Sequence, residues 1–340
     1  FGSEIIPRAI SMAQTRWNKY IAWLPEIISG DVAGEIERRV RGFDLAFFPW
    51  PYMLRVPRLD CPIVGIFHDF NFKYYFSGGD TFSATQRKKL EYEMPRWLAC
   101  ATPVVSTHFM ASELSYFYPA VSGKTKVVHL APFGGATLIE TSQAESIVRS
   151  LGITLPYLLY PTHMCTHKNV GPLIAALALL RAQGRKILLV LTGAGTERVL
   201  GHASSIGVRL DDAGGDVLGL GYVTNLQMDA LLQRAAVVVS TSLYEAGNGP
   251  GLDAWGRGTP VAMSNIPAFI EHIDIQDLRA KVFDPRSPQD IACKIATILD
   301  DPLQAHKDAQ HSLRALSNIT WNQTAKEYLT VFHEALAGAK

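Results

Sequence analysis

Two carboxylates flank a glycine-rich loop in the second half of the sequence. Glu245 precedes the loop, and Asp253 follows it eight positions later. The loop residues between them include Gly247, Asn248, Gly249 and Gly251. Backbone amides of such a loop at the start of a helix bind anions, whereas carboxylates accept hydrogen bonds from hydroxyl groups. A nucleotide sugar offers both groups and is the ligand that this pattern indicates. A purely structural interpretation, with turn glycines and an acid favoured by the helix dipole, stays open.

A basic side chain occupies another turn of the same half. Lys168 follows the apolar run 155–161 and precedes a helix predicted over 172–182. A lysine in a strand-to-helix turn supplies a point charge to a phosphate, while the helix N-terminus supplies amides. His163 and His167 lie nearby in the same turn. A lysine with no ligand is the alternative for Lys168 taken alone.

The elements that must position these residues alternate between strand and helix patterns. Apolar runs over 155–161, 186–192, 216–223 and 235–240 are typical of buried parallel strands. Helical patterns follow over 172–182, 226–234 and 287–299. This alternation predicts a doubly wound parallel sheet, which binds ligands outside the carboxyl ends of its strands.

The first half has a histidine at a similar place. Apolar runs over 43–49 and 62–67 predict two parallel strands, and His68 follows the second run. A histidine there can donate to a sugar hydroxyl or a phosphate, with Asp69 as its orienting neighbour, although a structural histidine is the alternative. Ser83 is predicted to cap a helix that ends near Met94, before Pro95.

Composition excludes several classes of protein. The 340 residues contain 32 Lys and Arg against 31 Asp and Glu, which is no electrostatic signature of nucleic-acid binding. The 4 cysteines lack metal-site spacing and fit reduced cytosolic thiols. No apolar run reaches the roughly 20 residues of a membrane span, and no signal peptide is visible. A cytoplasmic protein is therefore expected, with peripheral contact to the inner membrane surface as an option through basic residues 87–89.

Residues 242–262 resemble the acid-x7-acid motif and the following Gly-Thr-Pro-Val of retaining GT-B glycosyltransferases, the large group 1 (family 4) class. In that family the first acid touches the donor sugar, the second binds the ribose hydroxyls, and the loop amides approach the sugar and diphosphate. The resemblance thus implies a catalytic role for Glu245 and a donor-binding role for Asp253 and the loop. Glutamate is usual at the second position, so Asp253 is expected to bind with altered reach.

The resemblance includes the turn that ends in Lys168, which is similar to the family's phosphate-binding turn. Basic side chains there neutralise the leaving diphosphate, which implies a catalytic role for Lys168. An arginine often precedes the lysine; here His167 adjoins it as a candidate donor-binding residue and His163 stands nearby, which leaves the second positive charge open. The turn with Tyr222 and Val223 is implied to contact the base through backbone groups. Phe67, His68 and Asp69 resemble the His-Asp of first domains, which implies that His68 is catalytic, beside donor sugar and acceptor.

The fold that this resemblance implies is α/β and GT-B: two facing Rossmann-like domains, each a doubly wound parallel sheet, with an interdomain cleft. The predicted parts are an acceptor-side domain over 1–137, a linker over 138–152, a nucleotide-sugar-binding domain over 153–320, and a helix over 321–340 that returns to the first domain. The opening strand and glycine-rich loop of family members are not recognisable after Phe1. The first domain could therefore be truncated at its start.

The implied function is that of a retaining glycosyltransferase. It would move a hexosyl group from a GDP-mannose or UDP-hexose donor to a saccharide, glycolipid or other hydroxyl acceptor, in bacterial cell-surface polysaccharide or glycoconjugate synthesis. No metal ligand set is apparent, and no cofactor beyond the donor is expected. The alternatives are a catalytically silent binding or scaffold subunit and a GT-B nucleotide-sugar epimerase.

Overall fold

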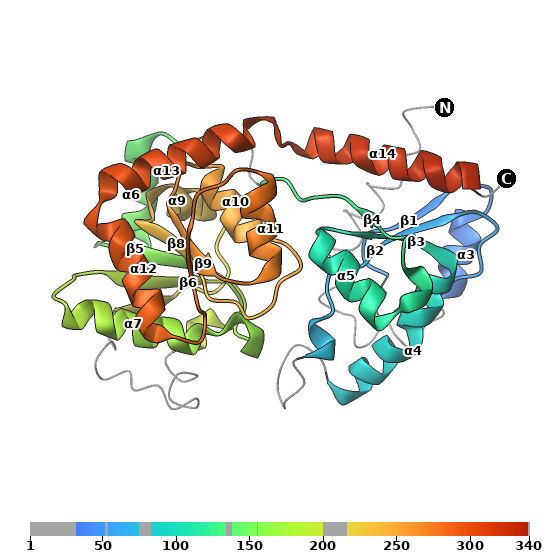
Figure 1. Cartoon of the computed structure of the whole chain (residues 1–340), viewed down its shortest axis with the longest axis horizontal. Coiled ribbons are helices and arrows are strands. Elements are labelled where there is room, and N and C mark those ends of the chain that lie inside the picture. Colours follow the sequence, from blue (N-terminus) through green and yellow to red (C-terminus); the bar gives the residue numbers. More distant parts are fainter. Residues whose placement is uncertain are drawn as a thin grey trace. The chain divides into compact units, whose positions relative to one another are not determined.

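The computed structural model describes residues 32–51, 54–74, 83–133, 138–154, 156–199 and 216–338. They divide into two α/β units (Figure 1). Within the described ranges, the first unit comprises 32–72, 83–128 and 325–338, and the second comprises 129–324 with the short piece 73–74. The predicted start of the first domain, residues 1–31, lies outside the described residues.

The first unit contains a parallel sheet of four strands in sequential order. In sheet order the strands are β1 Ala46–Phe48, β2 Ile63–Ile66, β3 Ala101–Val105 and β4 Lys126–Val127. The helices are α3 Val32–Val40, α4 Ala84–Cys100 and α5 His108–Phe117, with the 3₁₀ helices η2 Asn71–Lys73 and η3 Pro119–Val121. Each described strand of this sheet therefore pairs with its sequence neighbours.

Helix α4 begins where the sequence predicts and ends six residues later than the predicted end near Met94. Ser83 caps it, accepting from the Gln86 amide at 3.2 Å while the Gln86 side chain accepts from the Ser83 amide at 2.7 Å. The helix continues past Pro95 because its last turn is anchored. Trp97 is buried and donates to the Leu54 carbonyl oxygen at 2.9 Å, and this packing outweighs a proline cost of about 3 kcal/mol.

The second unit contains a parallel sheet of six strands whose order reverses once. In sheet order the strands are β10 Lys281–Phe283, β9 Val261–Ser264, β8 Val237–Ser240, β5 Tyr157–Pro161, β6 Leu188–Thr192 and β7 Val217–Gly219. From β5 the chain adds β6 and β7 on one side, then returns to add β8, β9 and β10 on the other. The switch point of this doubly wound sheet therefore lies between β5 and β8.

Helices cover both faces of the second sheet (Figure 1). They are α6 Thr141–Ser150, α7 Val170–Ala182, α9 Asn225–Arg234, α10 Gly249–Trp255, α11 Pro267–Ile275, α12 Pro288–Asp300 and α13 Pro302–Ala315, with the 3₁₀ helices η4 Thr166–Lys168, η5 Thr196–Arg198 and η6 Leu316–Asn318. Alternate strand residues point to opposite faces. Leu158 and Tyr160 join α7 and α12 in one core, whereas Leu159 joins α6, α9 and α10 in the other. The predicted α/β class with two parallel-sheet domains is confirmed.

The segment predicted as a linker over 138–152 differs from that expectation. Residues Thr141–Ser150 form α6, and Ala144 and Val148 are buried in the second unit's core. These two residues are four apart and therefore share one face of the helix. The boundary between the units falls after residue 128 rather than at the predicted linker.

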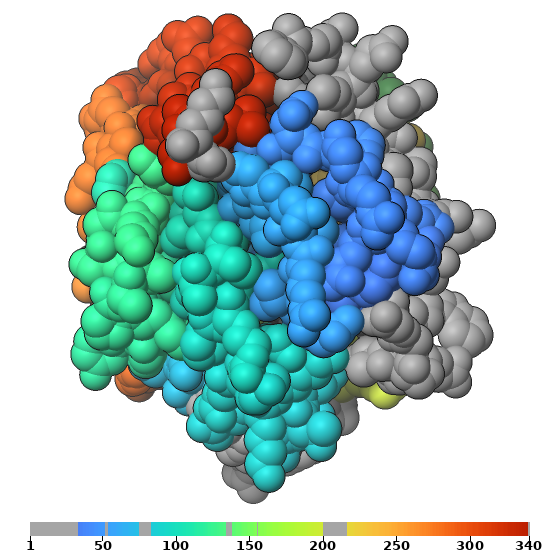
Figure 2. Space-filling model, turned by 90° about the vertical axis from the view of Figure 1, so that its right-hand side faces the viewer, coloured from blue at the N-terminus to red at the C-terminus, as the bar shows by residue number. Residues whose placement is uncertain are grey.

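The last helix, α14 Trp321–Gly338, occupies the predicted span, and its residues from 325 onward belong to the first unit. Val331 packs with the strand residues Val64 and Val104. Phe47 contacts Phe332 with ring centroids 5.1 Å apart. Figure 2 shows the red end of α14 directly beside blue and green segments of this unit. No helix in the described part of the chain is both long enough and apolar enough to cross a membrane.

Candidate functional site

The structure brings Lys168 and Glu245 together at the switch point of the second sheet. Lys168 lies in the turn after β5, and Glu245 in the loop after β8. The Lys168 Nζ donates to Glu245 Oε1, and the two side chains are only 14% and 21% exposed. The two predicted site residues therefore lie together at the edge of the sheet where doubly wound proteins bind ligands.

Hydroxyl groups of neighbouring residues hold this ion pair in place. Ser242 donates to Glu245 Oε1 at 2.6 Å, and its hydroxyl lies 2.8 Å from that of Tyr160. Tyr160 also donates to the backbone oxygen of Lys168 at 2.9 Å. Thr241 donates to the same oxygen at 3.2 Å. Strand β5 and the start of the loop after β8 thus hold both residues of the pair in one hydrogen-bond network.

Asn169 bends the chain between the Lys168 turn and helix α7. Its φ of 54° lies in the left-handed region that asparagine tolerates better than most residues. Its side-chain amide donates to the Thr241 carbonyl at 3.1 Å and to the Pro285 carbonyl at 2.7 Å. The bend directs Lys168 toward the loop after β8, where the Leu243 amide donates to the His167 carbonyl at 2.7 Å.

Mutual charge keeps both members of the pair ionised. Burial lowers the pKa of Lys168, but the Glu245 carboxylate raises it more, so the pKa lies above its ordinary value. Burial raises the pKa of Glu245, but the Lys168 charge and the hydrogen bonds from Lys168 and Ser242 lower it more, so the pKa lies below its ordinary value. The site therefore contains a fixed ammonium and a fixed carboxylate at neutral pH.

The glycine loop leads directly into α10, which begins at Gly249. Asn248 precedes the helix without a capping hydrogen bond from its side chain, and it is 1% exposed. Its Oδ1 has no hydrogen-bond partner among the described residues. A Cβ at Gly251 would lie 2.4 Å from this oxygen, so any larger residue there would force the buried Asn248 side chain to move. The structure thus gives a physical reason for one of the predicted loop glycines.

Asp253 lies on α10 and contacts groups of its own unit. Its Oδ1 accepts from the Phe133 amide at 2.6 Å. Arg257 donates to the Asp253 backbone oxygen at 2.8 Å and also pairs with Asp229. One carboxylate oxygen of Asp253, the residue predicted to bind the ribose, therefore binds the backbone of Phe133 to the helix. Its role toward a ribose stays a prediction.

The turns after β5, β6 and β7 lie against one another. A Cβ at Gly193 would lie 1.9 Å from the Thr162 oxygen, so the turn after β6 requires glycine to approach the turn after β5. The Gly193 amide donates to the Gly221 carbonyl at 2.6 Å. This places Tyr222, which is 85% exposed, at the same edge of the sheet, while Val223 packs against the core. Their predicted contact with a base is untested.

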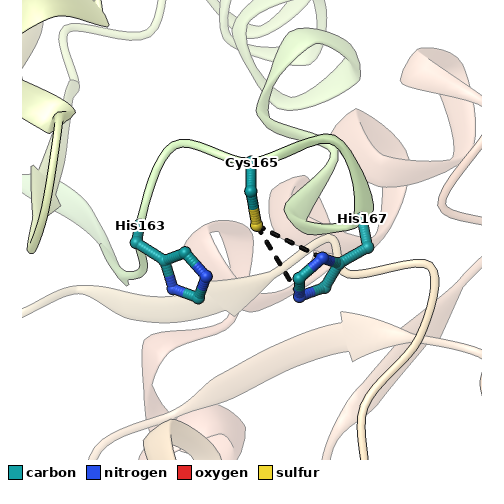
Figure 3. Close-up of side chains that lie close together, drawn as sticks. All are labelled: His163, Cys165 and His167. Carbon is teal, nitrogen blue, oxygen red and sulfur yellow. Dashed lines mark hydrogen bonds between the residues drawn. The ribbon is translucent and has the colours of Figure 1, made fainter. Parts of the chain in front are cut away.

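Three potential metal ligands meet in the turn after β5. His163, Cys165 and His167 have ligand atoms that all lie within 4.8 Å of one another (Figure 3). His167 is buried, and Cys165 Sγ lies 3.2 Å from its Nδ1. The sequence analysis expects no metal ligand set, and only the folded turn brings these side chains together.

His68 belongs to the first unit, at the carboxyl end of β2. Its Nε2 donates to the Pro49 carbonyl oxygen at 2.6 Å, and Trp50 stacks on the ring with centroids 4.5 Å apart. Asp69, the expected orienting group, accepts from the Asn71 amide at 3.2 Å. Burial lowers the pKa of His68, with the Pro49 bond opposing it. The ring is therefore neutral at pH 7, with Nε2 protonated.

Sequence reasoning did not identify Tyr160, Thr241 and Ser242, which support the ion pair. Ser242 lies three residues before Glu245, so its spacing was the available signal. Tyr160 is part of a continuous apolar strand and gave no signal, because strand alternation fits a core aromatic equally well. Tyrosine hydroxyls at buried strand ends find partners only in the folded chain.

The sequence matches a known family and several curated proteins. Residues 156–301 match the model of the family described as Glycosyl transferases group 1. The chain is 29% identical over 190 residues to glycogen synthase of Mycobacterium tuberculosis, covering 54% of this chain and 44% of that protein. It is 23% identical over 215 residues to MMP alpha-(1->4)-mannosyltransferase of Mycolicibacterium hassiacum, covering 62% of this chain and 49% of that protein. The chain thus spans less than half the length of these curated relatives.

Among solved structures, the Anabaena protein Alr3699/HepE, crystallised with UDP-glucose, is similar in fold. The TM-score is 0.68 at 17% sequence identity, covering 88% of this chain and 82% of that chain. At this identity the likeness shows the fold alone, and it confirms the predicted fold class. The Lys168 turn, Glu245 and Asp253 all lie within residues 156–301, the part of this chain that matches the family Glycosyl transferases group 1.

Proposed function

We propose that the protein is a retaining glycosyltransferase that uses a nucleoside-diphosphate hexose of the GDP-mannose or UDP-hexose type. The observation that supports this most is the Lys168–Glu245 pair at the switch point of the second sheet. An ammonium and a carboxylate fixed side by side suit a ligand with both phosphates and hydroxyls. The names of the curated relatives, a glycogen synthase and a mannosyltransferase, support the same class of reaction.

Lys168 is proposed to stabilise the leaving diphosphate. An ammonium has three donor hydrogens, so Lys168 can keep its bond to Glu245 and still donate to a phosphate oxygen. Negative charge on the diphosphate grows as the glycosidic bond breaks, so this contact strengthens toward the transition state. Loop amides at residues 247–251 are proposed to act with it.

Glu245 is proposed to orient the transferred sugar, and Asp253 the ribose. Glu245 already accepts from two donors, and its lowered pKa keeps it an acceptor for sugar hydroxyls at neutral pH. The buried oxygen of Asn248, which lies between them in the sequence, lacks a partner among the described residues. Such unsatisfied groups are uncommon in native structures, and a bound ligand is one explanation for them.

The acceptor is proposed to be a saccharide, a glycolipid or another hydroxyl compound, with His68 on the acceptor side. With Nε2 engaged by Pro49, Nδ1 is the ring atom that can accept a hydrogen bond. We further propose that the reaction serves cell-surface polysaccharide or glycoconjugate synthesis, in the cytoplasm or at the membrane surface, and that it needs no redox cofactor.

The test is a donor panel with two readouts. The full chain is incubated with GDP-mannose and several UDP-hexoses, and free nucleoside diphosphate is measured beside the thermal shift that each nucleotide produces. The proposal predicts slow donor hydrolysis with one base, lost in Lys168→Met. A protein that neither shifts nor hydrolyses any donor would instead be a silent scaffold.

A further inference from the structure

The turn after β5 presents every second side chain on one side. His163, Cys165 and His167 point toward a common centre, with the thiol between the two rings (Figure 3). Met164 packs instead against the core. The chain turns on both sides of Cys165: its amide donates to the His163 carbonyl at 2.9 Å, and η4 begins at Thr166. These turns and the core contact of Met164 bring the three side chains together.

The separations fit a tetrahedral ion. Zinc bonds of about 2.0–2.3 Å place neighbouring ligand atoms about 3.3–3.8 Å apart in a tetrahedron. Cys165 Sγ and His167 Nδ1 are 3.2 Å apart, and no pair of ligand atoms exceeds 4.8 Å. The His163 and His167 ring centroids are 5.7 Å apart. About 1 Å of side-chain adjustment would therefore complete three bonds.

The chemistry of the three ligand side chains determines which metals fit the site. Two imidazoles and one thiolate suit zinc or cobalt(II), whereas magnesium and calcium prefer oxygen ligands. On binding, the Cys165 thiol loses its proton to solvent, so the ion and thiolate together add one positive charge to the turn. Within the described residues no fourth His, Cys, Asp or Glu joins this group. Three protein ligands with one open position are typical of zinc sites that bind a further ligand.

Lys168 directly follows His167 in the same turn, so a phosphate bound by Lys168 would lie close to the three ligands. Glu245 offsets part of the Lys168 charge. A second cation in this turn would therefore add to the attraction of a diphosphate. We propose that His163, Cys165 and His167 bind one zinc-class ion whose open position takes a phosphate oxygen of the donor. The metal site stands on the triad alone, whereas the phosphate contact rests on the function proposed above.

Metal binding is tested first, on the untagged full chain. The protein is stripped with a chelator, desalted and titrated with cobalt(II) and then zinc. We expect one ion per chain, with a thiolate-to-cobalt charge-transfer band and the intense visible bands of four-coordinate cobalt. Cys165→Ser removes the charge-transfer band and weakens zinc binding by more than the about 10- to 100-fold that loss of an outer-sphere partner costs.

Matched controls come from the same unit. Cys293→Ser replaces an exposed cysteine, and His311→Gln replaces a histidine that pairs with Asp277. Both should bind zinc like the unchanged chain. His163→Gln and His167→Gln should each weaken binding. Circular dichroism confirms that each variant is folded. Absence of a charge-transfer band, or equal affinity in Cys165→Ser, overturns the metal site.

Coupling to the nucleotide is tested second. UDP and GDP are titrated into protein that was loaded with metal and then desalted, and into protein that was stripped of metal. Linkage requires that a metal which tightens nucleotide binding is itself held more tightly in its presence. We expect at least tenfold tighter nucleotide binding in the loaded chain and none of this gain in Cys165→Ser. Equal affinity overturns the phosphate contact.

The two proposals fail in different ways. Lys168→Met should lose nucleotide binding while the cobalt spectrum persists. If no nucleotide binds to any form of the protein although the spectrum appears, the glycosyltransferase function is contradicted and the metal site stands. If nucleotide binds equally well to a chain that takes up no metal, the function stands and the metal site is excluded.

Discussion

The two units place polar residues at strand ends in different ways. In the second, the order of strands reverses between β5 and β8, and the turns that follow these two strands supply Lys168 and Glu245. In the first, the described strands run in sequential order, and His68 after β2 is bound to the backbone oxygen of Pro49 after β1. A reversal lets two loops contribute side chains to one shared crevice. In the sequentially ordered sheet, the His68 side chain is instead bonded to the backbone of the segment that follows the neighbouring strand.

The largest expected effect comes from the ion pair of the second unit. Lys168→Met or Glu245→Gln should lower turnover about 10²- to 10³-fold, since each removes a fixed charge that we propose acts on the reacting groups. Steady-state release of nucleoside diphosphate measures this.

Stability separates a functional role from a structural one at this pair. Each single variant leaves one charge without its partner, so the double variant should be at least as stable as either single variant while remaining inactive. Arg185→Ala is the control, because Arg185 pairs with Asp300, whose side chain is 60% exposed, and such pairs contribute about 0–1 kcal/mol. Full activity in Lys168→Met would show that the ion pair of the second unit is not needed for turnover.

The next largest expected effect is a loss of stability of the second unit at acid pH. Burial, followed by the charge of His129, lowers the pKa of His272 to about 4. The unfolded chain therefore binds a proton that the folded chain does not between about pH 6.5 and 4. Stability is full above this range and falls as the pH drops through it, by about 2–3 kcal/mol at pH 4.5.

Urea unfolding at pH 7 and pH 4.5 measures this loss, and His272→Asn should reduce the difference between the two pH values. His272 lies in α11, so hydrogen exchange should show the weakening in the second unit before the first. Equal pH dependence in the variant would show that other groups, such as Asp277, dominate the acid response.

A smaller effect is expected for His68 in the first unit. His68→Asn should lower sugar transfer about 3- to 10-fold, the cost of one hydrogen bond between neutral groups. The thermal shift caused by UDP or GDP should stay unchanged, because the residues proposed to bind the diphosphate belong to the second unit. Loss of the shift in this variant would mean that both units bind the nucleotide.

The smallest effects compare the units through matched helix caps. Ser83 on α4 and Thr224 on α9 form the same capping box with a glutamine, and each accepts from it at 3.2 Å. Alanine at either position should cost about 1 kcal/mol. Hydrogen exchange of α4 and α9 measures it, and each variant should weaken its own unit. Equal weakening of both helices by either variant would show that the units unfold together.

Much of the second unit followed from local pattern. The runs at 155–161 and 235–240 predicted β5 and β8, because strands buried on both faces need continuous apolar residues. The same reasoning missed α6, whose burial depends on Ala144 and Val148, two small side chains in a polar segment. It also ended α4 at Pro95, because the anchor at Trp97 reaches across 43 positions to Leu54.

The sequence by itself determined the strands and the glycine loop, and it singled out Lys168 and Glu245 as candidate partners for a charged sugar ligand. These depend on neighbours in the chain, and spacing records them. Only the tertiary structure decided that Ser242 and Tyr160 brace the pair, that Pro49 holds His68, and that His163, Cys165 and His167 converge. The first two contacts join different strands or loops, and the convergence depends on how one turn bends. Local sequence pattern therefore does not fix these contacts.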